Sequence, residues 1–358
     1  MMRWPWLQAL RQPEICAGWS LTQWQEAVRQ TRRLRLLARL AEAITDACLL
    51  DRVPEPAARL LQSEQLISSY RQRLVAWAAN CTARTLADLS IPLVLLKGSA
   101  YQAQRLPISA GRLPSDLDIL VPRYALAQAL EALKSAGWEE PDLDDHDRRY
   151  YHEWSHEVPP MRHAAHPIEL DLHHNILPPL GPVRVDMEAL LTECQPSQWP
   201  GWSVLSPRDQ VLHSAAHLFF DSEPLERVRD LVDLDGLLRH HADADPSFWA
   251  ALEDRAEGLD LVEPLLLCCH FCSLWLDTPI PAQMQSRLQS VGAWHRVLRM
   301  LFRAVLAPAD LDRPRPMRQR AAATVVLWRY HLRRMPLRLL LPHAWHKLRG
   351  TRAGNADL

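Results

Sequence analysis

Residues 91–121 read IPLVLLKGSAYQAQRLPISAGRLPSDLDILV, and this stretch decides the fold. The apolar run at 91–96 ends at Lys97-Gly98-Ser99, a pattern that predicts a buried strand followed by a turn. Residues 116–121 first alternate between acidic and apolar side chains and then become apolar, as a strand that enters a core does. The sequence therefore predicts two strands here, joined by a short helix at about 100–105 and a loop.

A third strand and long helical regions surround these two strands. Residues 168–172, IELDL, alternate with the two-residue period of a strand. Apolar residues recur at helical spacing over much of 20–89, and helices are again predicted from about 206 to 305. The sequence thus predicts an α+β fold with a small mixed sheet. The expected regions are an N-terminal helical region (1–89), a core that carries the sheet (90–180), a C-terminal helical domain (181–312) and a basic amphipathic tail (313–358).

The composition of the chain narrows the class of protein. Its 358 residues are 48% hydrophobic and 23% charged, which is typical of globular proteins and excludes a disordered or low-complexity chain. The net charge of −1 gives no global electrostatic case for nucleic-acid binding. The seven cysteines show no disulfide spacing, no apolar leader opens the sequence, and no stretch is long enough to span a membrane. A reducing, cytoplasmic location is expected.

Three carboxylates lie on the predicted strands. Asp116 and Asp118 are two residues apart, so their side chains point to the same face of a strand, and Asp171 lies on the later strand. Neighbouring carboxylates repel each other, and their pairing favours a bound cation. Carboxylate oxygens suit Mg²⁺ or Mn²⁺, and a third carboxylate would allow two metal ions to be held in one site. We therefore predict that these three residues bind metal and are catalytic. A replacement of Asp118 by Asn is expected to leave the stability unchanged or to raise it slightly, because it relieves the repulsion.

Phosphate-binding features flank the carboxylates. Gly98 would let the backbone approach a phosphate group closely, and Ser99 would add a hydroxyl and an N–H at a helix start. Lys97 and Arg112 would neutralise a triphosphate, although each fits a purely structural role as well. His156 and His173 lie near the carboxylate strands in the sequence. Each would orient a phosphate or an acceptor, or would be a structural histidine.

The order of these motifs resembles a known superfamily. Lys97-Gly98-Ser99-Ala100, then Arg112-x-x-Ser115-Asp116-Leu117-Asp118, then Asp171-Leu172-His173 resembles the polymerase-β-type nucleotidyltransferases. More narrowly, the chain resembles the bacterial uncharacterised nucleotidyltransferase family, which is similar to abortive-infection-type toxin nucleotidyltransferases. Leu205-Ser206-Pro207 and Arg227-x-Arg229-Asp230 resemble later segments of that family, so the resemblance covers about residues 90–240, and the N-terminal helices fit the same family.

The resemblance implies a Mg-dependent enzyme that transfers a nucleoside monophosphate from a nucleoside triphosphate to a hydroxyl acceptor and releases pyrophosphate. It implies that Asp116 and Asp118 hold the metal ions, that Asp171 helps to activate the acceptor, and that Gly98, Ser99 and Ser115 belong to the nucleotide-binding motif. The chain departs from the family at 171–174, where DLHH stands in place of a frequent Glu-x-His-Trp.

Two other functions remain open at this stage, and so does the acceptor. The same sheet would also suit a catalytically inactive scaffold that binds a nucleotide or a partner, or a phosphotransferase that moves a terminal phosphoryl group. A tRNA end, a protein, a peptide and a small molecule all fit as the acceptor.

The tail is basic and apolar at once. Residues 317–352 contain nine Lys and Arg and no Asp or Glu. Such a segment fits a helix that makes weak contact with an anionic membrane surface or an acidic partner, which would make the protein peripheral to a membrane. The alternative is an ordinary helix packed on the helical domain. The burial of four apolar side chains would distinguish the two arrangements: Trp328, Leu337, Leu341 and Trp345.

Overall fold

The computed structural model describes residues 4–144, 151, 155–179, 183–221 and 224–334. Within these residues the fold is α+β, as expected, with one mixed sheet of seven strands in the order β3-β4-β5-β2-β1-β7-β6. Strands β2 and β5 are parallel, as are β1 and β7, and the other neighbours are antiparallel. The strands are β1 (Val94–Leu95), β2 (Asp116–Leu120), β3 (Trp138–Glu139), β4 (Met161–His163), β5 (His166–His173), β6 (Gln195–Pro196) and β7 (Ser203–Val204).

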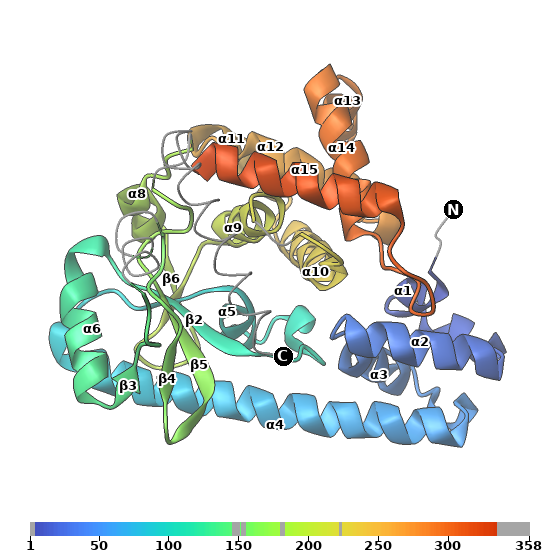
Figure 1. Ribbon diagram of the computed structural model, residues 1–358, viewed down its shortest axis with the longest axis horizontal. Coiled ribbons are helices and arrows are strands. Elements are labelled where there is room, and N and C mark those ends of the chain that lie inside the picture. The colour runs from blue at the N-terminus through green and yellow to red at the C-terminus, as the bar shows by residue number, and fades with distance from the viewer. Residues whose placement is uncertain (1–3, 145–150, 152–154, 180–182, 222–223, 335–358) are drawn as a thin grey trace.

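Helices surround this sheet in the described part of the chain (Figure 1). The helices that precede β5 in the chain are α1 (Pro5–Ala9), α2 (Leu21–Arg33), α3 (Leu37–Asp46), α4 (Glu55–Leu86), α5 (Lys97–Ala103) and α6 (Leu126–Ser135). Those after it are α8 (Met187–Thr192), α9 (Pro207–Phe219), α10 (Val228–Ala244), α11 (Phe248–Gly258), α12 (Val262–Leu276), α13 (Ala282–Gln289), α14 (Ala293–Leu306) and α15 (Met317–Arg334).

The two strands that carry the carboxylates lie next to each other inside the sheet. Leu117 and Ile119 of β2 are fully buried, and so are Leu170 and Leu172 of β5. Because side chains alternate along a strand, burial of these residues on one face directs the acidic residues of β2 and β5 to the opposite face. The hydrophobic core thus fixes the direction in which the carboxylates point.

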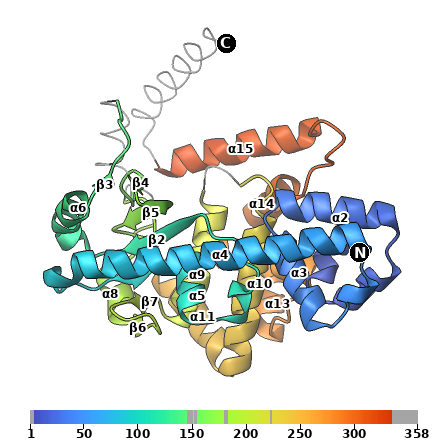
Figure 2. The same cartoon turned by 90° about the horizontal axis from the view of Figure 1, so that it is seen from below.

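Helix α4 connects the sheet to the N-terminal helices. It begins directly after Pro54 and runs for 32 residues, passing the sheet at one end and α2 and α3 at the other (Figure 2). Ser68 of α4 donates a hydrogen bond to the carbonyl oxygen of Arg112, and Trp202 donates to the carbonyl oxygen of Ala79. The N-terminal region is therefore attached to the loop before β2 and to the edge of the sheet.

One core joins regions that the sequence separates. The largest cluster of buried apolar side chains contains Trp6, Leu86, Leu117, Leu237 and Val326 among its members. These residues come from all four regions that the sequence predicts. The boundaries at 89, 180 and 312 stay a prediction, but the packing across them is continuous.

The expectation that the chain is purely helical after residue 180 is wrong for one segment. Strands β6 and β7 lie at 195–204 and extend the sheet beyond β1. Each has only two residues, and β6 contains Pro196, so neither can show the alternation that identifies a strand in a sequence. Strands β3 and β4 were not expected either, for the same reason of length.

The first half of the basic tail is helix α15, which packs on the body of the protein. It contacts α14, crosses it at a steep angle in Figure 1, and buries Ala322 and Val326. Its Trp328 is 50% exposed, while Leu337, Leu341 and Trp345 lie outside the described residues. Packing on the helical domain therefore holds for one face of α15. Across the described ranges, the helices offer no segment both long and apolar enough to cross a membrane.

Candidate active site

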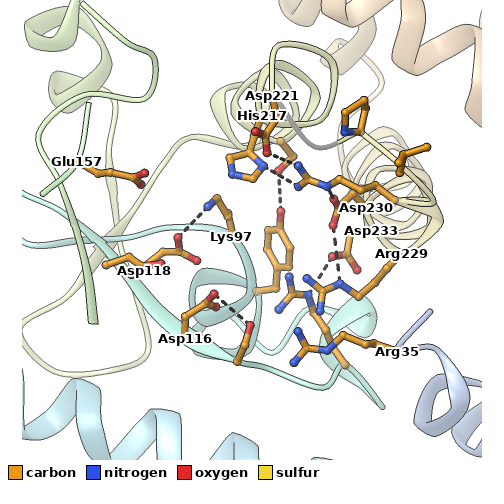
Figure 3. A pocket seen from close by; sticks show the side chains of 18 of the residues that line it. Arg35, Lys97, Asp116, Asp118, Glu157, His217, Asp221, Arg229, Asp230 and Asp233 are labelled. Carbon is orange, nitrogen blue, oxygen red and sulfur yellow. Dashed lines mark hydrogen bonds and ion pairs between the residues drawn. The ribbon is translucent and has the colours of Figure 1, made fainter. Parts of the chain in front are cut away.

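The three predicted carboxylates meet on one face of the sheet. In the parallel register of β2 and β5, Asp118 lies opposite Asp171 and Asp116 lies opposite Glu169. Opposed residues of neighbouring strands share a face, as do residues two apart on one strand. Asp116, Asp118 and Asp171 therefore lie side by side, and all three line one pocket of about 820 Å³ (Figure 3).

Mutual repulsion and burial perturb two of these carboxylates. Burial, together with the charges of Asp118 and Asp116, raises the pKa of Asp171 to about 7. Burial and the neighbouring Asp118 also raise the pKa of Asp116 above its ordinary value. Both groups are thus destabilised as anions, and a divalent cation between them would relieve this. The oxygen-only donor set of the three aspartates fits Mg²⁺ or Mn²⁺.

Asp118 differs because the ammonium group of Lys97 and the imidazole of His173 already contact it. Its Oδ1 lies 2.8 Å from Lys97 Nζ and 3.2 Å from His173 Nε2. Burial opposes ionisation of Asp118, but Lys97 and His173 outweigh it and hold its pKa well below the usual range. Lys97 reaches this position from a left-handed backbone conformation, with φ of 46°, which costs a non-glycine residue roughly 1–2 kcal/mol. Strain of this kind is concentrated at functional sites.

Three of the five predicted nucleotide-binding residues line the pocket, and the other two do not. Lys97, Arg112 and Ser115 line the pocket, and Ser115 donates a hydrogen bond to Asp116 Oδ2 at 3.0 Å. Ser99 is 3% exposed and donates to the carbonyl oxygen of Leu96 at 2.8 Å. Its hydroxyl proton is therefore used within the turn, away from the lining of this pocket.

The structure gives a packing reason for a glycine at position 98, which the sequence did not suggest. A Cβ at this position would lie 1.8 Å from Nη1 of Arg112. The glycine therefore makes room for a buried guanidinium, whatever its role toward a phosphate group. The assignment of Gly98, Ser99, Lys97, Arg112 and Ser115 to nucleotide binding stays a prediction.

A group of metal-ligating side chains lies next to Asp118. His156, Glu157 and His173 each offer one ligand atom within 4.8 Å of the others, and His173 Nδ1 lies 3.3 Å from Glu157 Oε2. The two histidines were predicted as accessory residues, and the structure brings them together. Glu157 lines the main pocket and was not predicted, because it follows an acidic stretch in which no single carboxylate stands out.

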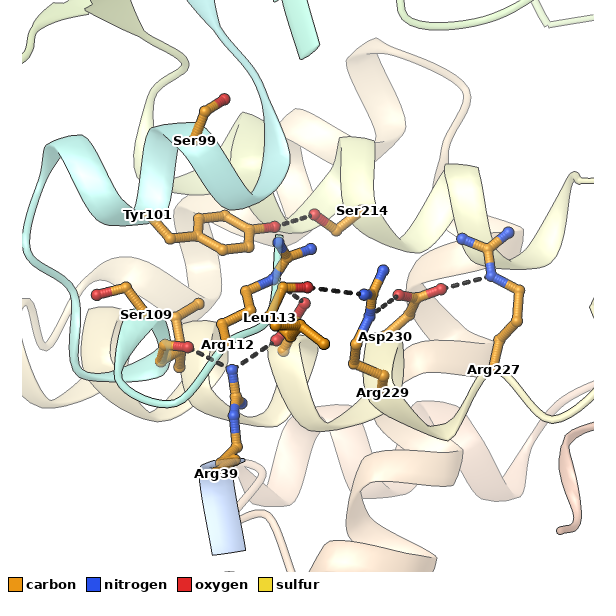
Figure 4. A network of polar contacts seen from close by, with 12 residues as sticks. Arg39, Ser99, Tyr101, Ser109, Arg112, Leu113, Ser214, Arg227, Arg229 and Asp230 are labelled. Atoms are coloured by element: carbon orange, nitrogen blue, oxygen red, sulfur yellow. Dashed lines mark hydrogen bonds and ion pairs between the residues drawn. The ribbon is translucent and has the colours of Figure 1, made fainter. Parts of the chain in front are cut away.

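The opposite wall of the pocket comes from the helices and is rich in arginine (Figure 4). Asp233 of α10 accepts from Arg112 Nε and from Arg39 Nη2, each at 2.9 Å. Arg227 pairs with both Asp221 and Asp230 at 2.5 Å. These ion pairs connect α10 to α3 and to the loop before β2, and most of their residues line the pocket.

Several lining residues had no signal in the sequence. Arg35 comes from the turn between α2 and α3, and Thr324 and Leu327 come from α15. Each lies more than 60 positions from the nearest predicted carboxylate. Only the packing of the N-terminal helices and of the tail against the core brings them to the pocket.

The structure thus brings three aspartates together on one face of a mixed sheet, beside a charged pocket. A family model described as "Uncharacterised nucleotidyltransferase" matches residues 20–277. The match covers more than half of the chain, so the protein belongs to this nucleotidyltransferase family. It includes most of the N-terminal helices, as expected, and continues beyond residue 240 to residue 277. No curated protein and no solved structure matches the chain.

Proposed function

We propose that the protein transfers a nucleoside monophosphate from a nucleoside triphosphate to a hydroxyl group of an acceptor and releases pyrophosphate. The observation that carries this proposal is the parallel register of β2 and β5, which sets Asp118 opposite Asp171 with Asp116 beside them. Membership of the nucleotidyltransferase family supports the same reaction. We further infer that the family is related to polymerase-β-type enzymes and to abortive-infection-type toxins.

Asp116, Asp118 and Asp171 would hold Mg²⁺ or Mn²⁺. When bound, the metal supplies positive charge that stabilises the attacking and leaving oxygens of an in-line displacement. The amino group of Lys97 lies beside Asp118 in the pocket. Once a metal ion neutralises Asp118, this amino group would be able to bind a phosphate oxygen of the nucleotide instead. His156 and His173 would orient a phosphate group or the acceptor beside Asp118.

Asp171 is suited to act as the general base. Without a metal ion, burial and the charges of Asp118 and Asp116 raise its pKa to about 7. A bound divalent cation would lower this pKa, so that Asp171 would be ionised and able to accept a proton at neutral pH. In the proposed step the acceptor oxygen forms a bond to the α-phosphorus while its proton passes to a carboxylate oxygen of Asp171. The bond between the α-phosphorus and the bridging oxygen to the β-phosphate breaks, and pyrophosphate leaves with the electron pair of that bond.

One labelling experiment tests the reaction. The protein is incubated with Mg²⁺, a cell extract and each α-³²P-labelled nucleoside triphosphate in turn, and macromolecular, peptide and small-molecule fractions are examined for label. We expect label in one fraction, equimolar pyrophosphate, and loss of both with Asp118→Asn. Because the label would identify a tRNA, a protein, a peptide or a small molecule, it also defines the acceptor. Absence of pyrophosphate with every triphosphate would contradict the proposal.

A scaffold without turnover is the second candidate, and one observation favours it. Lys97 pairs with Asp118 and His173 lies within hydrogen-bond distance of it, so the charge of this carboxylate is compensated without a metal ion. Such a scaffold would bind a triphosphate with Mg²⁺ and release neither pyrophosphate nor a nucleoside diphosphate. A phosphotransferase would release the diphosphate instead, so product analysis separates all three functions.

A further inference from the structure

The arginine-rich wall of the pocket carries more positive charge than its carboxylates balance. Asp233 is shared by Arg112 and Arg39, and Arg227 is held by two further aspartates. These contacts account for every carboxylate that lines this wall. They leave Arg35 without an ion pair to any described carboxylate, and Arg229 with only a long contact of 3.7 Å to Asp230.

Arg35 is the clearest case. Among the described residues, no carboxylate lies within ion-pair distance of its guanidinium, although the side chain is half-buried. Its backbone has φ of 58°, at the point where the chain leaves α2, and the N–H of Leu36 donates to the carbonyl oxygen of Thr31 at 2.7 Å. Glycine is the usual residue at this helix-terminating position, and another residue there costs roughly 1–2 kcal/mol. An arginine is thus held in a strained conformation without an intramolecular salt bridge.

Arg229 of α10 is only loosely engaged. Its Nε lies 3.7 Å from Asp230 Oδ1, and its Nη1 donates to the carbonyl oxygen of Leu113 at the long distance of 3.5 Å. Asp230 itself is bound more tightly by Arg227. In Figure 3, the guanidinium groups of Arg35 and Arg229 face the part of the pocket that separates them from Asp116.

The two arginines also affect each other. Burial, followed by the charges of Arg229 and Arg112, lowers the pKa of Arg35 below its ordinary value. Both guanidinium groups line the open pocket, and neither donates a hydrogen bond to a described carboxylate at normal distance; this is the arrangement of a site for an anion. Guanidinium groups suit phosphate in particular, because their planar N–H donors match its oxygens in pairs.

We propose that Arg35 and Arg229 form a phosphate-binding subsite opposite the three aspartates. The phosphate would come from the triphosphate of the nucleotide or from a phosphate of the acceptor. The proposal deepens the proposed function and rests on it for the identity of the ligand, but the charge imbalance stands without it. A polyphosphate would span the pocket, with one end near the carboxylates and the other on the arginines.

Titration calorimetry with tripolyphosphate and Mg²⁺ tests the subsite at low ionic strength. A hydrogen bond between charged groups contributes enough that its loss weakens binding about tenfold or more. We expect this loss for Arg35→Ala and for Arg229→Ala, and a smaller loss for Arg35→Lys, which keeps the charge without the paired donors. The matched control is Arg32→Ala, because Arg32 lies three residues before Arg35, is exposed, and pairs with Glu64 away from the pocket.

A stability measurement separates a binding role from a merely structural one. Arg35→Gly removes both the strained conformation and the unpaired cation. We therefore expect this variant to melt at the same or a higher temperature than the wild type while it binds tripolyphosphate about tenfold more weakly. A lower melting temperature together with unchanged binding would assign Arg35 to the fold and overturn the proposal.

Two further arms identify the source of the phosphate and separate this proposal from the proposed function. Weakened tripolyphosphate binding assigns the subsite to the nucleotide, whereas weakened binding of a tRNA mixture with normal tripolyphosphate binding assigns it to the acceptor. Equal binding of both probes by wild type and variants, or no binding of either by the wild type, overturns the subsite. Pyrophosphate release is followed in parallel: if the wild type binds but never releases it, the transfer proposal fails and the subsite stands.

Discussion

Asp233 joins three parts of the protein, and its replacement by Asn should be costly. The carboxylate is 3% exposed and accepts one hydrogen bond from Arg112, before β2, and one from Arg39 of α3. Asn keeps the size of the side chain but removes the charge, so two poorly exposed guanidinium groups lose their counter-ion. Breaking a buried pair by neutralising one partner costs about 3–5 kcal/mol, a large part of the roughly 5–15 kcal/mol that keeps a typical protein folded.

Urea denaturation, followed by tryptophan fluorescence, measures this loss. The matched control is Asp254→Asn, because Asp254 is exposed on α11, and its stability should stay within about 0.5 kcal/mol of the wild type. A second replacement, Arg39→Met, should restore part of the stability of Asp233→Asn, because it removes one of the two unpaired cations. If Asp233→Asn unfolds at the same urea concentration as the control, the ion-pair network does not hold these regions together and our account of it is wrong.

Other predictions concern the pocket and the tail. The pKa of Asp171 is about 7 in the folded protein, against an ordinary 3.8. Without a divalent metal, the contribution of Asp171 to stability should therefore be full below pH 4 and be lost as the pH rises through 7. Melting curves at several pH values, with and without Mg²⁺, measure this loss, and an identical loss in Asp171→Asn would contradict it. Gly98→Ala should displace the guanidinium of Arg112 and lower both the melting temperature and pyrophosphate release, whereas Gly258→Ala, where a Cβ meets nothing within 4 Å, should do neither. Asp118→Asn should abolish transfer and lower the melting temperature without Mg²⁺, because Lys97 loses its partner; a rise would favour the simpler repulsion argument. If the tail contacts anionic membranes, Trp328→Asp should reduce co-sedimentation with anionic vesicles, and unchanged binding would exclude that face of α15.

The structure changes the expected effect of truncating the tail on nucleotide transfer. From the sequence, removal of the residues after Asp312 is expected to spare nucleotide transfer. The structure places Thr324 and Leu327 of α15 in the wall of the pocket. We therefore expect such a truncation to alter substrate binding as well, and point substitutions on the exposed face of α15 are the better test of membrane contact.

The sequence by itself determined the α+β class and the three carboxylates, because both depend on local periodicity. Asp116 and Asp118 share a face whatever strand they occupy, since side chains alternate along any strand. The alternation of 168–172 likewise identified the strand that carries Asp171. The motif spacing around Lys97 was enough to indicate the family that the comparison then established.

Tertiary structure alone decided how the pocket is completed. The register that places Asp118 opposite Asp171 is a contact between residues 53 positions apart, and no local pattern specifies it. Lys97 acquires its carboxylate partner, and Gly98 its packing requirement, only when β2 and the loop before it return to the start of α5. Arg35 reaches the site because the N-terminal helices pack against the sheet and α10. A sequence pattern predicts the face of its own helix or strand on which a side chain lies. The residues that this side chain contacts across the pocket depend on how distant elements pack together.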